Sequence, residues 1–192
     1  MMEGNAMKKI IALVLCFVML LTCAAALAET APAEKESMGV LRVNKAFDIR
    51  YKALDNGYKI NIYQQNDMAI IANISTPDKT LPGIGLIIIF DDSWADTERL
   101  NDISQEDMDA VKASFYEEYE TLEFETRETS QGTELLIVKV PSGQDAYVYT
   151  IYKGHEIELH LTPGEEQEAL TDADIDRVAD FLGEMEFVPV EE

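Results

Sequence analysis

Apolar and polar residues alternate along much of the chain, a pattern typical of half-buried β-strands. In the segment 58–64 (YKINIYQ), for example, Ile60 and Ile62 fall on one face. The segment 84–90 (IGLIIIF) is apolar on both faces, which predicts a central strand covered on both sides. Further strands are predicted at residues 47–51, 68–74, 122–127, 133–140, 146–153 and 155–162.

Short turns between these segments predict antiparallel pairing. Asp55-Asn56-Gly57 contains Asn-Gly, the strongest short hairpin signal, and predicts that strand 47–51 pairs with strand 58–64. Lys153-Gly154 separates the last two strands. We therefore expect a mostly antiparallel sheet of about six or seven strands.

Two segments have helical periodicity, and each begins with a helix-capping signal. Ser104 and Asp107 have the spacing of a capping box, and Thr171 followed by Asp174 has the same spacing. Together with the sheet, they predict an α+β fold in which two main helices pack on the sheet. The apolar faces consist of Met108, Val111, Phe115 and Tyr119 in the first helix, and of Ile175, Val178, Ala179 and Leu182 in the second.

The N-terminal residues have the three parts of a secretory signal peptide. Lys8 and Lys9 form a positive region, and an unbroken apolar run follows them. Ala26-Leu27-Ala28 then places small residues where a signal peptidase recognises them. We predict cleavage near Ala28, before Glu29, and hence a secreted, extracellular or cell-envelope protein.

Two alternatives to simple cleavage stay open. The apolar stretch 10–28 is close to the ~20 residues that span a bilayer, so it could be retained as an anchor. It ends in small residues without a basic stop-transfer cluster, which favours cleavage. Lipidation at Cys23 is the other alternative, although Thr22 stands where a lipoprotein signal has Gly, Ala or Ser.

Composition divides the chain into four parts. Residues 1–28 are the predicted signal, and 29–46, whose first part is rich in Ala, Glu and Pro, are predicted as a flexible tether. Residues 47–188 form the predicted single α+β domain, and 189–192 form an acidic tail. Both cysteines, Cys16 and Cys23, lie in the signal. The exported chain therefore has no disulfide, and its core must stabilise it.

The chain is strongly acidic, with a formal net charge of −22 at neutral pH. Such a charge repels nucleic acids and anionic lipid surfaces, so we expect no nucleic-acid partner. After removal of the signal we also expect no membrane span. The charge suits a basic partner. The few lysines, the export signal with its short positive region and the absence of disulfides indicate a bacterial protein.

Glu156, Glu158 and His160 are the first residues that suggest chemistry. At alternate positions of one strand they point to the same face, and carboxylate–histidine sets bind divalent metals. A charged, solvated strand face explains the same alternation, and we favour it. His155 falls on the apolar side, where we expect a partly buried edge residue.

Asp172, Asp174 and Asp176 resemble the start of a calcium loop. Such a loop needs Gly at its sixth position and Glu at its twelfth, where this chain has Arg177 and Gly183. Acidic residues also complement the dipole of a first helical turn. We therefore predict a helix start and no metal site.

The acidic segment 91–98 surrounds Trp94, the one tryptophan of the chain. A tryptophan beside carboxylates can form a binding surface, but such a residue more often closes a core beneath a loop.

Tyr147 and Tyr149 share one face of their strand and Tyr152 lies on the other, which is typical of cross-strand packing. The motifs of the common hydrolases and phosphate-binding loops are absent from the sequence. We therefore assign no catalytic, cofactor-binding or metal-binding residue and expect no cofactor.

The order of elements resembles the Mog1/PsbP/DcrB-like group of small α+β domains. The matching parts are the hairpin YKINIYQQNDMAIIANI, the helix from Ser104, the strands 133–140 to 155–162 and the closing DIDRVADFLGEMEF. The resemblance implies an accessory or binding role, often at membranes or with a larger complex, and it transfers no site residue.

From these observations we expect an exported, non-enzymatic binding or accessory domain that acts at the cell exterior or envelope with a basic protein or envelope partner. The alternative is a divalent-cation-dependent surface protein or hydrolase. It would use the face of Glu156, Glu158 and His160, or the acidic segment 91–109.

Overall fold

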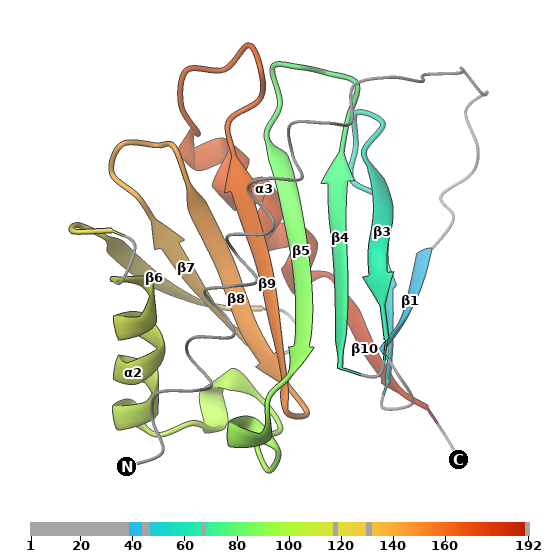
Figure 1. The fold of residues 1–192 in the computed structure, drawn as a ribbon, viewed down its shortest axis with the longest axis vertical. Helices are drawn as coiled ribbons and strands as arrows, with labels where there is room; N and C mark the ends of the chain where they lie inside the picture. Colours follow the sequence, from blue (N-terminus) through green and yellow to red (C-terminus); the bar gives the residue numbers. More distant parts are fainter. Residues whose placement is uncertain (1–38, 44–46, 67, 117–118, 130–131, 191–192) are drawn as a thin grey trace. The chain divides into compact units, whose positions relative to one another are not determined.

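The structure, a computed structural model, describes residues 39–43, 47–66, 68–116, 119–129 and 132–190, which belong to one compact unit, residues 34–192. The fold is α+β (Figure 1). Its main element is a seven-stranded sheet in which every neighbouring pair is antiparallel. In spatial order its strands are β3 (Lys59–Gln65), β4 (Ala69–Ser75), β5 (Gly83–Phe90), β9 (His155–Thr162), β8 (Ala146–Tyr152), β7 (Glu134–Lys139) and β6 (Glu123–Glu128).

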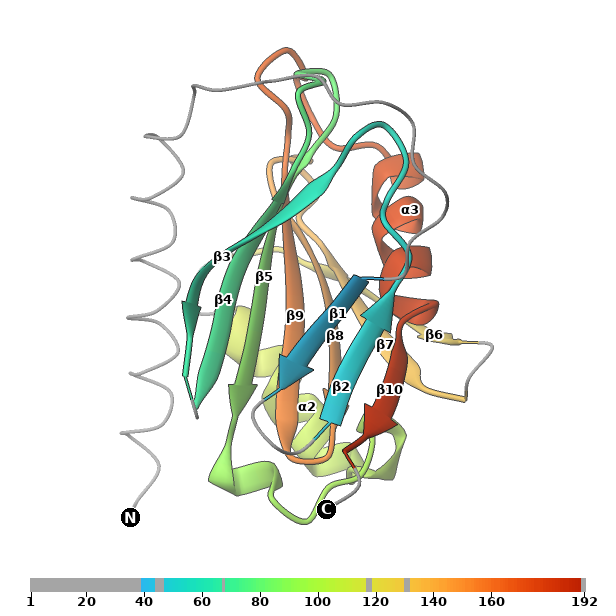
Figure 2. The same ribbon diagram turned by 90° about the vertical axis from the view of Figure 1, so that its right-hand side faces the viewer.

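A second, three-stranded sheet and one helix lie on the same side of the large sheet (Figure 2). We call this side the α3 face. The buried side chains of these elements form one core with those of the large sheet, including Phe47, Ile49 and Val178. The elements are β1 (Gly39–Val43), β2 (Phe47–Tyr51), β10 (Glu186–Pro189) and α3 (Asp172–Gly183).

The opposite side of the large sheet, which we call the α2 face, is covered over β6, β7 and β8. There Leu100, Met108 and Val111 pack with Leu136 and Val138 in a second apolar cluster. Over β3, β4 and β5, no helix of the described residues lies on this face (Figure 1). The covering elements are η1 (Asp92–Trp94), η2 (Leu100–Asp102) and α2 (Gln105–Phe115).

The predicted α+β class, the antiparallel sheet and the two helices are confirmed, and each predicted strand is present with its ends within one residue of the prediction. The first helix is shorter than predicted, because it ends at Phe115 and leaves Tyr119 outside it. The second helix starts with a complete capping box between Thr171 and Asp174. No helix of the described residues is long and apolar enough to cross a membrane.

Two predictions at the small sheet are wrong, and one of its strands was not predicted. Part of the predicted tether, Gly39–Val43, forms β1, and Glu186–Pro189, where no strand was predicted, forms β10. Asn56 and Gly57 have the positive φ angles of a tight turn, 66° and 75°, but they do not close a hairpin. The strand before them, β2, pairs with β1 and β10, while β3 pairs with β4. The Asn-Gly signal correctly predicted a tight turn in the backbone. It did not predict which strands pair, because pairing depends on packing between segments that are distant along the chain.

The hairpin between β8 and β9 holds the segment that follows β5. Gly154 donates its N–H to Thr97 O at 2.9 Å and accepts from Asp91 N at 3.0 Å. Its φ is +72°, and an added Cβ would lie 3.2 Å from Ala95 Cα and 3.3 Å from Trp94 O. Glycine is therefore needed here both for its backbone conformation and for the close approach of the loop.

We expect Gly154→Ala to destabilise the protein more than Gly57→Ala. Both glycines have positive φ, so each change costs about 1 kcal/mol of backbone strain. A Cβ at Gly57 meets only Pro77 Cδ at 3.8 Å, whereas one at Gly154 crowds the loop and costs roughly another 1 kcal/mol or more. Free energies of unfolding from urea titrations test this, and equal losses for the two variants would contradict it.

Candidate functional site

Strand β9 places Glu156, Glu158 and His160 on the α2 face, as the alternation predicted. The intervening Ile157, Leu159 and Leu161 are fully buried on the α3 face. The three polar side chains are not a solvated surface, however. His160 is buried and the two glutamates are half-buried.

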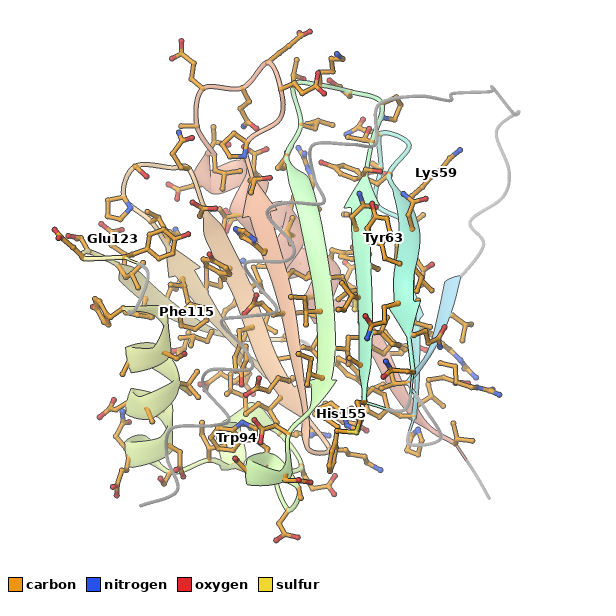
Figure 3. The ribbon with its side chains drawn as sticks, viewed as in Figure 1. Lys59, Tyr63, Trp94, Phe115, Glu123 and His155 are labelled. Atoms are coloured by element: carbon orange, nitrogen blue, oxygen red, sulfur yellow. The ribbon has the colours of Figure 1, made fainter. Side chains whose placement is uncertain are left out.

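Glu156 accepts two hydrogen bonds at the same oxygen. Trp94 donates its indole N–H to Oε1 at 2.8 Å, and Tyr149 donates its hydroxyl at 3.1 Å. Burial raises the pKa of Glu156, and the charge of Asp91 adds to this rise, while the two hydrogen bonds oppose it. The carboxylate thus joins the loop after β5 to the sheet, with Trp94 at the end of the strands (Figure 3).

His160 is held between an aromatic ring and a carboxylate. The ring of Tyr147 stacks on its imidazole, with centroids 4.5 Å apart and planes 8° apart. His160 Nε2 lies 2.8 Å from Asp145 Oδ1, and the hydroxyls of Tyr147 and Tyr119 are hydrogen-bonded at 2.9 Å. This arrangement ties the turn before β8 and the segment after α2 to the central strand.

Burial raises the pKa of both Tyr147 and Tyr149, and the tyrosines therefore stay neutral. Tyr149 acts as a hydrogen-bond donor to Glu156, and Tyr147 shares a hydrogen bond with Tyr119. As predicted, the two share the α2 face, and Tyr152 lies on the other. Their contacts are those of packing side chains that also have a polar end.

The described residues contain no group of three or more His, Cys, Asp or Glu side chains that could hold a metal ion. Along β9 the candidate ligands have separate partners: Glu156 bonds Trp94 and Tyr149, and His160 bonds Asp145. Glu156, Glu158 and His160 therefore share one face, as predicted, but their arrangement favours a network of structural hydrogen bonds over a metal site.

His155 lies on the α3 face, as expected, but the prediction of an edge residue is wrong. Its strand is the middle one of seven, and the side chain is buried. The imidazole contacts Phe47 and Phe90 edge-on, with centroids 5.1 and 5.2 Å away, and Nδ1 lies 2.8 Å from Lys153 O. Burial lowers the pKa of His155.

The three aspartates near Thr171 point in different directions. Asp172 bonds Lys139 at 2.9 Å, and Asp176 bonds Arg127 at 2.6 Å. Asp174 Oδ2 accepts from the backbone and hydroxyl of Thr171 and from Gln167. The prediction of a helix start, rather than a calcium loop, is confirmed for these residues.

The segment 91–109 combines a buried inner side with an acidic outer side. Leu100 is fully buried and Trp94 is half-buried against the same cluster. The single basic residue of this segment, Arg99, donates to Gly132 O at 3.2 Å. The exposed carboxylates, which we call the acidic end, are Asp92, Asp96, Glu98, Asp102, Glu106, Asp107 and Asp109.

Comparison with known proteins finds no matching family model, no matching curated protein and no matching solved structure. The Mog1/PsbP-like resemblance stays a prediction.

The sequence did not predict Asp145 as the partner of His160 or Tyr119 as the partner of Tyr147. Neither has a local signal, because each contact joins strands or loops that are distant along the chain.

Glu156→Gln should stabilise the protein at neutral pH. Glutamine keeps an oxygen that can accept from Trp94 and Tyr149, and it removes the half-buried charge. A carboxyl whose pKa rises on folding contributes stability below its unfolded pKa of about 4.3, and this contribution is lost as pH rises through the folded-state pKa. The advantage of the variant should therefore shrink on acidification.

Urea denaturation at several pH values measures this difference. Glu123→Gln is the control, because it removes the same charge from an exposed position on β6. A pH dependence shared by both variants would reflect net charge alone and would overturn the assignment to Glu156.

Proposed function

We propose that this protein is an exported, non-enzymatic binding or accessory domain at the cell exterior or envelope, and that its acidic end contacts a basic partner. The observation that carries the proposal is the segregation of charge in the fold. Of 37 acidic residues, only Asp67 and Asp78 fall between Tyr58 and Phe90, the part of the chain that forms β3, β4 and β5. The other acidic residues lie outside this part of the chain, eight of them in the segment 91–109.

The architecture keeps the carboxylates of the acidic end facing outward. Trp94 and Leu100 anchor the segment on its inner side, and hydrogen bonds from the β8–β9 hairpin fix its backbone. A fixed surface of like charge accelerates encounters with a partner of opposite charge, and salt weakens this attraction. Binding through the acidic end should therefore be sensitive to salt.

The cation-dependent alternative has less support. Glu156 and His160 already have protein partners, and the described residues offer no metal-binding cluster. An accessory role also agrees with what the Mog1/PsbP/DcrB-like resemblance implies, although that resemblance concerns the order of elements and supplies no site.

We expect residues 29–192, used as bait against envelope and culture fluid of the parent cell, to capture a basic partner at low salt and to lose it at high salt. The double variant Asp96→Lys, Glu98→Lys should weaken capture at least tenfold, because it reverses charge at the acidic end. The matched control is Glu166→Lys, Glu168→Lys, which changes net charge equally in the loop after β9, at the other end of the strands (Figure 1).

Equal loss in both double variants would show that net charge, and not the acidic end, attracts the partner. Capture that is unchanged at high salt would overturn the electrostatic contact itself. A metal-dependent rise in melting temperature, reversed by chelation, would favour the cation-dependent alternative.

A further inference from the structure

Strand β3 is a terminal strand of the large sheet. It exposes large apolar side chains and carries little charge, unlike β6 at the opposite edge. A terminal strand presents unpaired backbone N–H and C=O groups to any strand that approaches. Within Lys59–Gln65, Ile62 is 45% exposed and Tyr63 is 51% exposed, and Met68 in the adjoining turn is 60% exposed. These are three of the five large hydrophobic side chains that are exposed among the described residues.

Charge separates this edge from the opposite one. Strand β6 carries Glu123, Glu125 and Glu128 in six residues, so a second β6 would meet it with repulsion. Strand β3 has one charged residue, Lys59, and neither β4 nor β5 has an acidic residue. Figure 3 shows Lys59 and Tyr63 at one edge of the sheet and Glu123 at the other.

We propose that β3 is a self-association edge, at which a second copy of this chain pairs antiparallel with the first. Two copies with a net charge of −22 repel each other over most of their surfaces, and the edge at β3 is where they meet without opposing carboxylates. In a two-fold arrangement centred on Ile62, Ile62 meets its own copy and Lys59 meets Gln65. Two-fold pairing uses one surface twice and closes as a dimer.

The local geometry limits where the pairing can occur. A β-bulge between Ile62 and Gln64 bends the strand, and Gln65 Nε2 donates to Arg42 O of β1 at 2.9 Å. The register of β3 is therefore regular only over Lys59–Ile62, and a pairing centred on Ile62 sets this part of each copy against the bulged part of the other, which leaves few regular hydrogen bonds. A short edge of this kind predicts a weak and reversible dimer rather than an extended aggregate.

The test is sedimentation equilibrium of the protein recovered after export, at low and high salt. Screening reduces the repulsion between two acidic molecules, so dimerisation should strengthen as salt rises. This response is opposite in sign to that expected for a basic partner at the acidic end. The two proposals can therefore fail separately.

Ile62→Glu and Ile62→Lys should each raise the dimer dissociation constant at least tenfold, while an equimolar mixture of the two should restore a mixed dimer. Restoration cannot result from a folding defect, and equal urea midpoints of the variants and the wild type provide a second check. Val40→Glu is the control, since Val40 is 55% exposed on the edge strand β1 of the small sheet. A monomer at all salt concentrations, no restoration in the mixture, or loss of the dimer in Val40→Glu alone would overturn the proposal.

Discussion

The pairing of β9 with both of its neighbours is the constraint on which the rest of the structure depends. β9 lies at the centre of the large sheet and joins β5, from the first half of the chain, to β8, from the second. Alternate side chains of β9 point to opposite faces of the sheet, and each face belongs to a separate core. Ile157, Leu159 and Leu161 contribute to the core beneath α3, and the polar residues between them hold the elements of the other face. Both faces are therefore set by a single register.

Charge is distributed so that this framework tolerates a large net negative charge. Two of the cations connect α3 to the sheet: Arg127 on β6 bonds Asp176, and Lys139 on β7 bonds Asp172. Both carboxylates are exposed, so each pair contributes little stability by itself. Their importance lies in position, because they neutralise acids of α3 that lie within reach of β6 and β7. The carboxylates of the acidic end have no such cations among the described residues, and they lie where the segment meets solvent.

The sequence predicted those features that depend on local periodicity and capping. The capping box at Thr171 and Asp174, the apolar strand β5 and the face shared by Glu156, Glu158 and His160 follow from spacing alone. The partners of these residues do not. Trp94 and Glu156 are far apart in the chain, and their contact exists only because the β8–β9 hairpin lies against the loop after β5. Strands β1 and β10 were missed because each is short and gains its stability from β2, which separates them.

A buried polar network on a sheet face need not be catalytic. A shift of β9 by one residue relative to its neighbours would turn Glu156, Glu158 and His160 into the apolar core beneath α3 and place Ile157, Leu159 and Leu161 on the α2 face. The cost of burying unpaired charges makes that register inaccessible. Hydrogen bonds with Trp94, Tyr149 and Asp145 stabilise the observed register, because each of these residues meets its partner on β9 only in that register. Specification of register accounts for the placement of these side chains, and the two surfaces that we propose for partners, the acidic end and the edge of β3, lie outside this network.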